Sequence, residues 1–450
     1  MGNDFLFTIT DTLMDILKDR NWDDESCGIK REIMYFFSNS LCYDSNCNTR
    51  TSSKRIMEMF KVSLLFLNEA RYPYMEGLIL NDLVDVDELD TIYTLVLSVL
   101  TYFGNIIISD RNEYKELINN CMSELIYLLL FYIQLSENEL MGLNPSDLLL
   151  EYDMNLHSVR GYSLYLVKSL CHHDKFKDFF EANFMQVLQS VLEEAHYQNF
   201  TDSPCSWKLH EACYYVISCQ DTTMMSCVYN YEIVRFILSF LTEVVEPDLS
   251  SRLPILQGTA LAVCCSFLQL RTETDIELII ALTLKQITPH SDQFLRALCV
   301  RALNKTYRDF GEEETTKNNV LRSQLSAVFE TCLNTLTSVK YDVQGRLLEL
   351  TVMLIIYEPQ LCLNREMRLM KNTLGITQGT FRVKNAILCQ ALFNLIIPLG
   401  LCTEAIQKTW MPHISHVLSS QDSSREQRKL MQDIYSIFLR VKPPLNEFSV

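Results

Sequence analysis

The sequence predicts an all-α protein, and three observations carry this prediction. Glycine (12) and proline (11) are both scarce among the 450 residues, so few turns interrupt the chain. Apolar residues recur at helical spacing almost everywhere, as Val159, Tyr162 and Leu166 do on one helix face. Strict alternation of apolar and polar residues, the pattern of a half-buried strand, is almost absent. We therefore expect long helices and no β-sheet.

The most apolar stretch, residues 125–135 (LIYLLLFYIQL), contains one strongly polar side chain, Gln134. A membrane-spanning helix needs about 20 apolar residues, and a run of 10 to 14 is typical of a buried helix. The first residues carry Asp4 and lack the basic region of a secretory signal. Leu6 stands where a myristoylation signal has Ser or Thr. We expect a soluble, intracellular chain without a membrane partner.

The sequence is also self-similar. A polar or basic residue near the start of a helix, followed by an apolar stripe, recurs seven times at spacings between 38 and 50 residues. These residues are Arg160, His210, Gln257, Arg296, Arg346, Lys384 and Arg428. A period of 40 to 47 residues is the size of a two-helix HEAT repeat, and such repeats stack because none can bury its apolar face alone. We predict that residues 1–450 form a single right-handed superhelical HEAT-repeat solenoid of about ten repeats, without separate globular domains.

Charge is unevenly placed along the chain. Residues 1–250 hold 17 Lys and Arg against 38 Asp and Glu, a net charge of −21. Residues 251–450 hold 22 against 18, a net charge of +4. An acidic surface repels nucleic acid and attracts basic proteins. The sequence therefore predicts a basic protein partner and no nucleic-acid partner.

Patterns of catalysis and metal binding are missing or incomplete. The sequence has no glycine-rich phosphate loop, nucleophile elbow or dinucleotide fingerprint. His210 and Glu211 begin like a zinc-protease helix, but Tyr214 stands where the second histidine is needed. The sixteen cysteines lie mostly in apolar helical runs, as buried free thiols do, and Cys42 with Cys47 lacks a second cluster at matching spacing. We expect no enzyme activity, no cofactor and no metal.

Four stretches in colinear order resemble the importin-9 receptors of the importin-β (karyopherin) family. They are SELIYLLLFYIQLSENELMGLNPSDLLLEYDMNLHSVRGYSLYLV, SWKLHEACYYVIS, FLTEVVEPDLSSRLPILQGTALAVCCSF and VKPPLNEF. The resemblance implies an importin-β-like solenoid that acts as a nuclear transport receptor in cytoplasm and nucleus. It also implies basic cargo, core histones above all and ribosomal-type proteins, and a response to the GTPase Ran.

The resemblance is to the middle portion of these receptors. Their first repeats form much of the Ran site, so we expect Ran to bind this chain weakly or not at all. We also expect a monomer. Two alternatives stay open at this stage: a HEAT-repeat scaffold or regulatory subunit of another class, and an inactive partial duplicate of the family.

Two acidic stretches are candidate cargo-binding sites. The first lies within residues 76–92, predicted as an acidic loop or helix start, where carboxylates alternate with apolar residues; its members are Asp82, Asp85, Asp87, Glu88 and Asp90. The second is the thinner group Glu137, Glu139, Asp147, Glu151 and Asp153, where the resemblance implies a denser acidic run. A solvated loop is the alternative interpretation of the first stretch. We expect Arg160, Arg296 and Arg346 to tie neighbouring repeats together rather than to touch a ligand.

Overall fold

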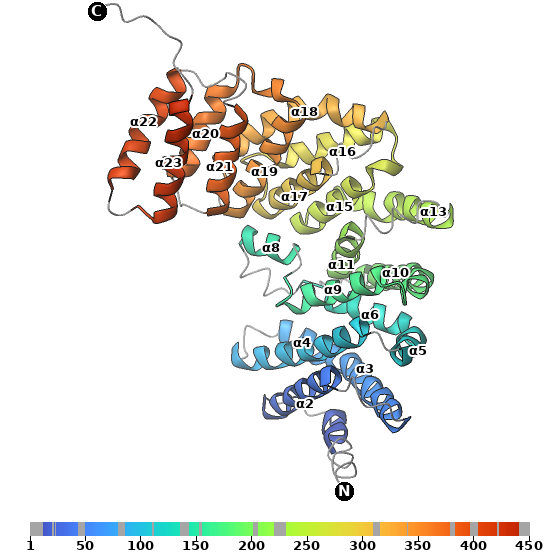
Figure 1. Ribbon diagram of the computed structural model, residues 1–450. Helices are drawn as coiled ribbons and strands as arrows, with labels where there is room; N and C mark the ends of the chain where they lie inside the picture. The colour runs from blue at the N-terminus through green and yellow to red at the C-terminus, as the bar shows by residue number, and fades with distance from the viewer. Residues whose placement is uncertain are drawn as a thin grey trace, which may run out of the picture. The chain divides into compact units, whose positions relative to one another are not determined.

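The computed structural model shows an α-helical chain (Figure 1). It describes residues 12–19, 22, 24–43, 50–79, 86–109, 112–135, 144–152, 155–200, 206–219, 231–308, 316–339, 341–378, 383–396, 404–420 and 423–440. All regular structure in these ranges is helical, with no strand, so the all-α prediction is confirmed. The chain divides into two compact units, residues 1–234 (unit 1) and 235–450 (unit 2).

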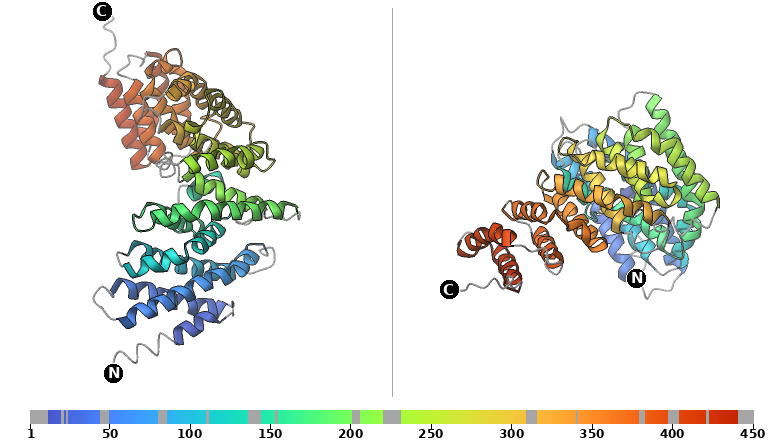
Figure 2. Two further views of the ribbon diagram at one scale, coloured as in Figure 1. Left: turned by 90° about the vertical axis from the view of Figure 1, so that its right-hand side faces the viewer. Right: turned by 90° about the horizontal axis from the view of Figure 1, so that it is seen from above.

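Unit 1 is a stack of helices in two layers (Figure 2, left). Its helices are α2 (Asp24–Tyr43), α3 (Arg50–Ile79), α4 (Val86–Ile108), α5 (Asn112–Asn120), α6 (Met122–Tyr132), α8 (Pro145–Tyr152), α9 (Val159–His172), α10 (Lys177–Phe200) and α11 (Ser206–Cys219). One layer contains α2, α4 and α9, and the other contains α3, α6 and α10. Across the layers, α3 packs on α4, α6 on α9 and α10 on α11, which are the contacts expected of two-helix repeats.

Unit 2 repeats this arrangement. Its elements are α13 (Tyr231–Phe240), the π-helical turn η3 (Leu241–Val245), α14 (Glu246–Asp248), α15 (Pro254–Ser266), the 3₁₀ turn η4 (Leu268–Leu270), α16 (Glu273–Gln286), α17 (Gln293–Arg308), α18 (Thr316–Thr335), α19 (Tyr341–Tyr357), the 3₁₀ turn η5 (Pro359–Cys362), α20 (Glu366–Gln378), α21 (Val383–Ile396), α22 (Glu404–Ser419) and α23 (Arg425–Arg440). Helices α15, α17, α19, α21 and α23 pack in order in one layer. Helices α16, α18, α20 and α22 form the other layer.

The seven recurring polar residues each lie in a different helix of this array, within its first two turns. In three of these helices, α15, α17 and α19, the fourth residue of the helix is polar. Its side chain donates a hydrogen bond to the backbone carbonyl eight residues earlier. The bonds join Gln257 Nε2 to Leu249 O (2.6 Å), Arg296 Nη1 to Thr288 O (3.2 Å) and Gln344 Nε2 to Leu336 O (3.2 Å). Each bond satisfies a carbonyl at the end of the preceding helix and closes the turn between the two helices of a repeat.

The apolar run at residues 125–135 begins in α6 and is buried. Leu125, Ile126 and Leu129 are all fully buried. Helix α6 packs against α3, α5, α9, α10 and α11, so an apolar surface nearly all round the helix is covered by neighbours. No helix in the described ranges is long and apolar enough to cross a membrane. The count of about ten repeats over residues 1–450, and the absence of separate globular domains, stay predictions.

Candidate functional site

The first acidic stretch lies at the start of α4. This helix begins at Val86, so the backbone of Asp87, Glu88 and Asp90 lies in its first two turns. This start lies within residues 76–92, which the sequence predicts as an acidic loop or helix start. Asp82 and Asp85 lie outside the described residues, as do the side chains of the other three. Their cargo-binding role stays a prediction.

In the second stretch, the structure shows one side chain, that of Asp147 in the first turn of α8. Asn144 precedes this helix, and its Oδ1 accepts hydrogen bonds from the backbone amides of Ser146 (2.9 Å) and Asp147 (3.2 Å). Asn144 Nδ2 in turn donates to Asp147 Oδ2 at 2.6 Å. Asp147 therefore helps to cap α8, which has Pro145 at its first helical position.

The side chains of the other four residues of this stretch lie outside the described part of the structure. Glu151 lies in α8, but its side chain is outside the described part of the chain, and so are Glu137, Glu139 and Asp153. All five belong to the connection between α6 and α9, which is 26 residues long (133–158). The corresponding connection between α18 and α19 has five residues (336–340). This connection is therefore an insertion into one helical pair, and it carries half of the ten candidate carboxylates.

A buried polar cluster anchors the end of this insertion to the stack. Arg160 in α9 donates to both carboxylate oxygens of Glu211 in α11, with Nη1 to Oε2 at 2.9 Å and Nη2 to Oε1 at 2.7 Å. The side chains of Arg160 and Glu211 are 1% and 0% exposed. Tyr152, the last residue of α8, donates its hydroxyl hydrogen to Glu211 Oε1, and Arg160 Nη1 also donates to the carbonyl of Ile133. The guanidinium carbon lies 4.4 Å from the ring centroid of Tyr215.

This environment keeps the Arg160 guanidinium charged. Burial alone lowers the pKa of the Arg160 guanidinium, but Glu211, Tyr152 and Tyr215 outweigh it, and the pKa is raised. Both oxygens of the Glu211 carboxylate accept hydrogen bonds from buried side chains of the protein, those of Arg160 and Tyr152. Because Glu211 serves Arg160, the His210–Glu211 pair that begins like a zinc-protease helix has no carboxylate free to act as a base. No three His, Cys, Asp or Glu side chains gather as metal ligands anywhere in the described ranges.

A second polar chain crosses three helices of one layer of unit 1. Arg71 Nη1 in α3 donates to the hydroxyl of Tyr127 in α6 at 3.1 Å, and this hydroxyl donates to Glu194 Oε2 in α10 at 3.0 Å. Burial and the adjacent Glu194 carboxylate raise the pKa of the Tyr127 phenol, which therefore keeps its proton at neutral pH. The chain ties successive repeats of this layer together.

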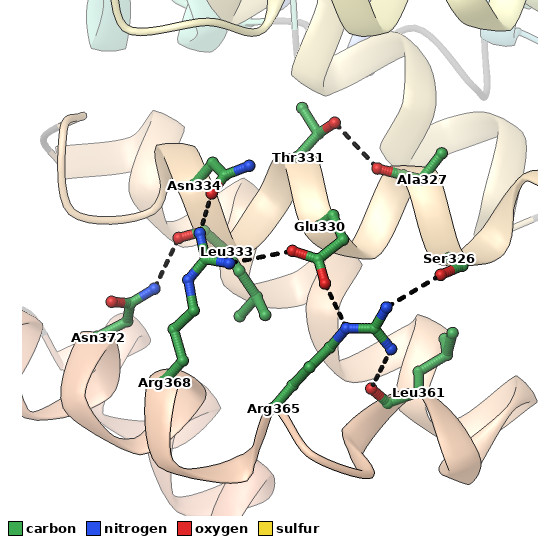
Figure 3. Close-up of polar contacts among 10 residues, drawn as sticks. All are labelled: Ser326, Ala327, Glu330, Thr331, Leu333, Asn334, Leu361, Arg365, Arg368 and Asn372. Atoms are coloured by element: carbon green, nitrogen blue, oxygen red, sulfur yellow. Dashed lines mark hydrogen bonds and ion pairs between the residues drawn. The ribbon is translucent and has the colours of Figure 1, made fainter.

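The equivalent layer of unit 2 has an ionic network between α18 and α20 (Figure 3). Glu330 receives hydrogen bonds from Arg365 Nε and from Arg368 Nη1, the latter at 3.0 Å. Arg365 Nη2 also donates to Ser326 Oγ at 3.2 Å, and Arg368 donates to Asn334 Oδ1. Because both guanidinium groups are occupied by the neighbouring helix, this network joins two repeats.

The other layer of unit 2 shows how Arg346 acts. Its Nη1 bonds Glu349 Oε2 of the same helix at 3.3 Å, and Glu349 Oε1 accepts from Arg308 Nη2 of α17 at 2.7 Å. Arg160 contacts a carboxylate of a neighbouring repeat directly, as expected, and Arg346 reaches α17 through Glu349. Arg296 instead bonds Thr288 O at the turn within its own repeat. Asn304 adds a bond from its Nδ2 to the Arg346 carbonyl at 2.9 Å.

Comparison with known proteins supports the resemblance. No family model matches the sequence. Importin-9 of Drosophila melanogaster is 22% identical over 375 residues, which are 80% of this chain and 36% of that protein. The chain thus spans about a third of the length of this curated relative.

Two solved structures are similar in fold. The structure of Lph2, described as a bidirectional nuclear transport receptor in S. cerevisiae, has a TM-score of 0.55 and 16% identity, covering 92% of this chain and 45% of that one. Kap121p bound to RanGTP has a TM-score of 0.55 and 13% identity, covering 95% and 42%. The predicted fold class and the predicted resemblance are therefore confirmed: the chain has the HEAT-repeat solenoid fold of the karyopherins and resembles importin-9 over four fifths of its length.

Proposed function

We propose that this chain is a nuclear transport receptor of the importin-9 type, which binds basic proteins such as core histones and moves between cytoplasm and nucleus. The 375-residue similarity to importin-9 is the observation that carries the proposal. The fold shared with Lph2, itself described as a nuclear transport receptor, supports it. In this function the chain is a binding protein and not an enzyme.

Charge supports basic cargo. The net charge of −21 over residues 1–250 creates a negative potential that steers and holds Lys- and Arg-rich partners. Part of this charge lies on exposed side chains of α10; they are Asp178, Glu193 and Glu194. Exposed charges are screened beyond about 8–10 Å at physiological salt, so the binding of histones should weaken as salt is added.

Ran is the second proposed partner to test. Kap121p was solved with RanGTP bound, which says that a protein of this fold binds Ran. The weak or absent Ran binding expected from the sequence stays a prediction. If it holds, RanGTP cannot release the cargo, because two ligands are coupled only when both bind. The chain would then store or chaperone histones rather than deliver them in one direction.

One experiment tests these points together. The full chain is immobilised and offered purified core histones at about 100 mM and about 300 mM salt, with and without Ran loaded with GTP. We expect capture at the lower salt, less capture at the higher salt, and no release by Ran. Absence of histone capture at the lower salt contradicts the proposed cargo. Release by RanGTP contradicts the predicted Ran insensitivity and leaves the cargo assignment standing.

A further inference from the structure

Helix α8 is docked on unit 1 through a small apolar face and one hydroxyl group. Leu148, Leu149 and Tyr152 are 0%, 2% and 1% exposed. Among the described helices, α8 makes its main contact with α9. Its docked position therefore depends on few side chains, and Tyr152 reaches beyond α9 to Glu211 of α11.

The acceptor of the Tyr152 hydroxyl is a buried carboxylate. Glu211 lies in α11, 59 residues further along the chain, and is fully buried together with Arg160. A hydrogen bond to a buried carboxylate is charge-assisted and stronger than one between neutral groups. The Tyr152 ring also packs on the Tyr215 ring of α11, with centroids 4.5 Å apart. Tyr152 thus fastens the end of α8 to an ion pair that belongs to the core of unit 1.

Residues 155–158, which lead into α9, are fixed as well. Tyr93 of α4 accepts a hydrogen bond from the backbone amide of Val159 at 2.9 Å, and Ser158 Oγ donates to Asn155 O at 3.0 Å. A Cβ at Gly161 would lie 2.0 Å from Asn155 O, so only glycine allows these residues to pass this close to α9. Helix α8 is thus held at Tyr152, and the residues that lead into α9 are held separately by Tyr93 and by their own turn.

We propose that Tyr152 is a positioning residue: with Glu211 and Arg160 it latches α8 to the stack, so that α8, with Asp147 in its first turn, meets a basic protein partner in a single orientation. This inference rests on the proposed function for its partner. The latch itself is a property of the chain alone and can be measured without the partner. A pre-positioned α8 binds its partner more tightly because no conformational entropy is lost in ordering the helix when the complex forms.

Two substitutions separate the latch from the overall fold. Tyr152→Phe removes one hydroxyl and keeps the ring and the Arg160–Glu211 pair. Tyr152→Ala removes the ring as well and releases α8. The matched controls are Tyr307→Phe and Tyr307→Ala, because Tyr307 is a fully buried tyrosine of unit 2 whose hydroxyl donates to Leu321 O at 3.3 Å. Variants at Glu211 are avoided here because they leave Arg160 buried without its partner.

The measurements are amide hydrogen exchange in the full chain and its affinity for a core histone dimer at about 100 mM salt. A hydrogen bond to a charged group is worth roughly a ten-fold change in an opening equilibrium or more, so we expect α8 amides to exchange about ten-fold faster in Tyr152→Phe. The apparent dissociation constant rises as the fraction of docked α8 falls, so we expect a rise of roughly ten-fold in Tyr152→Ala. Both Tyr307 variants should leave α8 exchange and histone affinity as in the wild type.

The outcomes distinguish the possible failures. Unchanged α8 exchange in both Tyr152 variants overturns the latch. Faster exchange in Tyr152→Ala with wild-type histone affinity overturns the positioning role while the proposed function stands. An equal loss of affinity in Tyr307→Ala also overturns it, because general destabilisation would then explain the effect. A wild-type chain that binds no histone overturns the proposed function, and the positioning role with it, whatever the exchange data show for the latch.

Discussion

Arg160 and Glu211, in α9 and α11, form a bidentate ion pair that is almost completely removed from solvent. Taking two charges out of water is costly, so the pair adds little net stability over an apolar pair of the same volume. Its importance lies in what happens when it is broken, since one charge would then remain buried alone.

Glu211→Ala should therefore lower the free energy of unfolding of the region around α9 and α11 by about 3–5 kcal/mol. Urea denaturation followed by circular dichroism measures this loss. The comparison variant is Glu349→Ala, whose carboxylate is 25% exposed and pairs with a half-exposed Arg308. That variant should lose about 1 kcal/mol or less. Equal losses in the two variants would show that burial does not distinguish them.

The network around Glu330 should behave as a surface network (Figure 3). Glu330 and Arg368 are 35% and 44% exposed, so water and salt screen their attraction. We expect Glu330→Gln to cost about 0.5–1 kcal/mol at low salt and less at about 500 mM salt. Denaturation midpoints of unit 2 at the two salt concentrations measure the difference. A loss above about 3 kcal/mol that is the same at both concentrations would contradict this description.

Close packing of neighbouring repeats makes one glycine in α15 necessary. A Cβ at Gly258 would lie 2.8 Å from Leu298 Cδ1 and 2.9 Å from Leu298 Cβ in α17. Gly258→Ala should therefore cost about 1–3 kcal/mol through overpacking. At Gly375 in α20 the nearest atom to a new Cβ is 3.9 Å away, so Gly375→Ala should be neutral or stabilising by up to about 1 kcal/mol through helix propensity. Thermal unfolding measures the stability of the two variants. A higher midpoint for Gly258→Ala than for Gly375→Ala would contradict overpacking at Gly258.

Buried thiols should make the protein less stable in alkali. Burial raises the pKa of Cys265 to about 11 and that of Cys332 to about 12, whereas an unfolded cysteine ionises near 8.5. Below about pH 8.5, the pKa of an unfolded cysteine, the thiols are protonated in both the folded and the unfolded state, so their ionisation costs no stability. As the pH rises above about 8.5 only the unfolded state loses protons, so stability falls from there towards the folded values. The free energy of unfolding measured from pH 7 to 10 should decrease, and an increase would contradict the prediction.

The same cysteines should be protected from reagents in the folded state. At pH 7.5 a thiol-specific reagent should modify Cys264, Cys265 and Cys389 far more slowly in the native protein than in urea, because all three are buried and their pKa values are raised. Mass spectrometry of the labelled protein gives the rates residue by residue. Equal native and unfolded rates would show that these thiols are not buried.

The helices and their period could be predicted from the sequence because the repeats share one pattern of apolar and polar residues. An apolar stripe faces the stack, and in three of the described helices a polar residue near the helix start bonds a carbonyl at the end of the preceding helix. Which polar residue of the helix makes this bond could not be predicted. In α19 the bond to Leu336 O comes from Gln344, while the sequence pattern pointed to Arg346, two residues away. Both are polar and near the helix start, so only the structure separates them.

The partner of Arg160 could not be predicted. Glu211 is visible in the sequence, but it lies 51 residues away, and nothing local to either residue indicates that both are buried. The capping role of Asp147 could be predicted from the local pattern of Asn144, Pro145 and Asp147, because a cap uses residues adjacent in sequence. Its charge alone indicates only a basic partner. The carboxylates from Asp82 to Asp90 show the limit of composition, since charge indicates the class of partner and leaves the contacts undefined.

The most direct test of the account is a calorimetric titration of the full chain with a core histone dimer. The wild type is compared with a variant that removes four of the five charges of the first acidic stretch, Asp85→Asn, Asp87→Asn, Glu88→Gln and Asp90→Asn. A control variant removes the same charge from exposed glutamates of unit 2, namely Glu243→Gln, Glu273→Gln, Glu277→Gln and Glu426→Gln.

We predict that the wild type and the control bind the histone dimer with similar affinity at about 100 mM salt and lose affinity as salt rises. The variant of the first stretch should bind at least about ten-fold more weakly, because each lost charge contact at an interface contributes to both steering and affinity. A wild type that does not bind the dimer, or a first-stretch variant that binds as tightly as the control, would contradict the account.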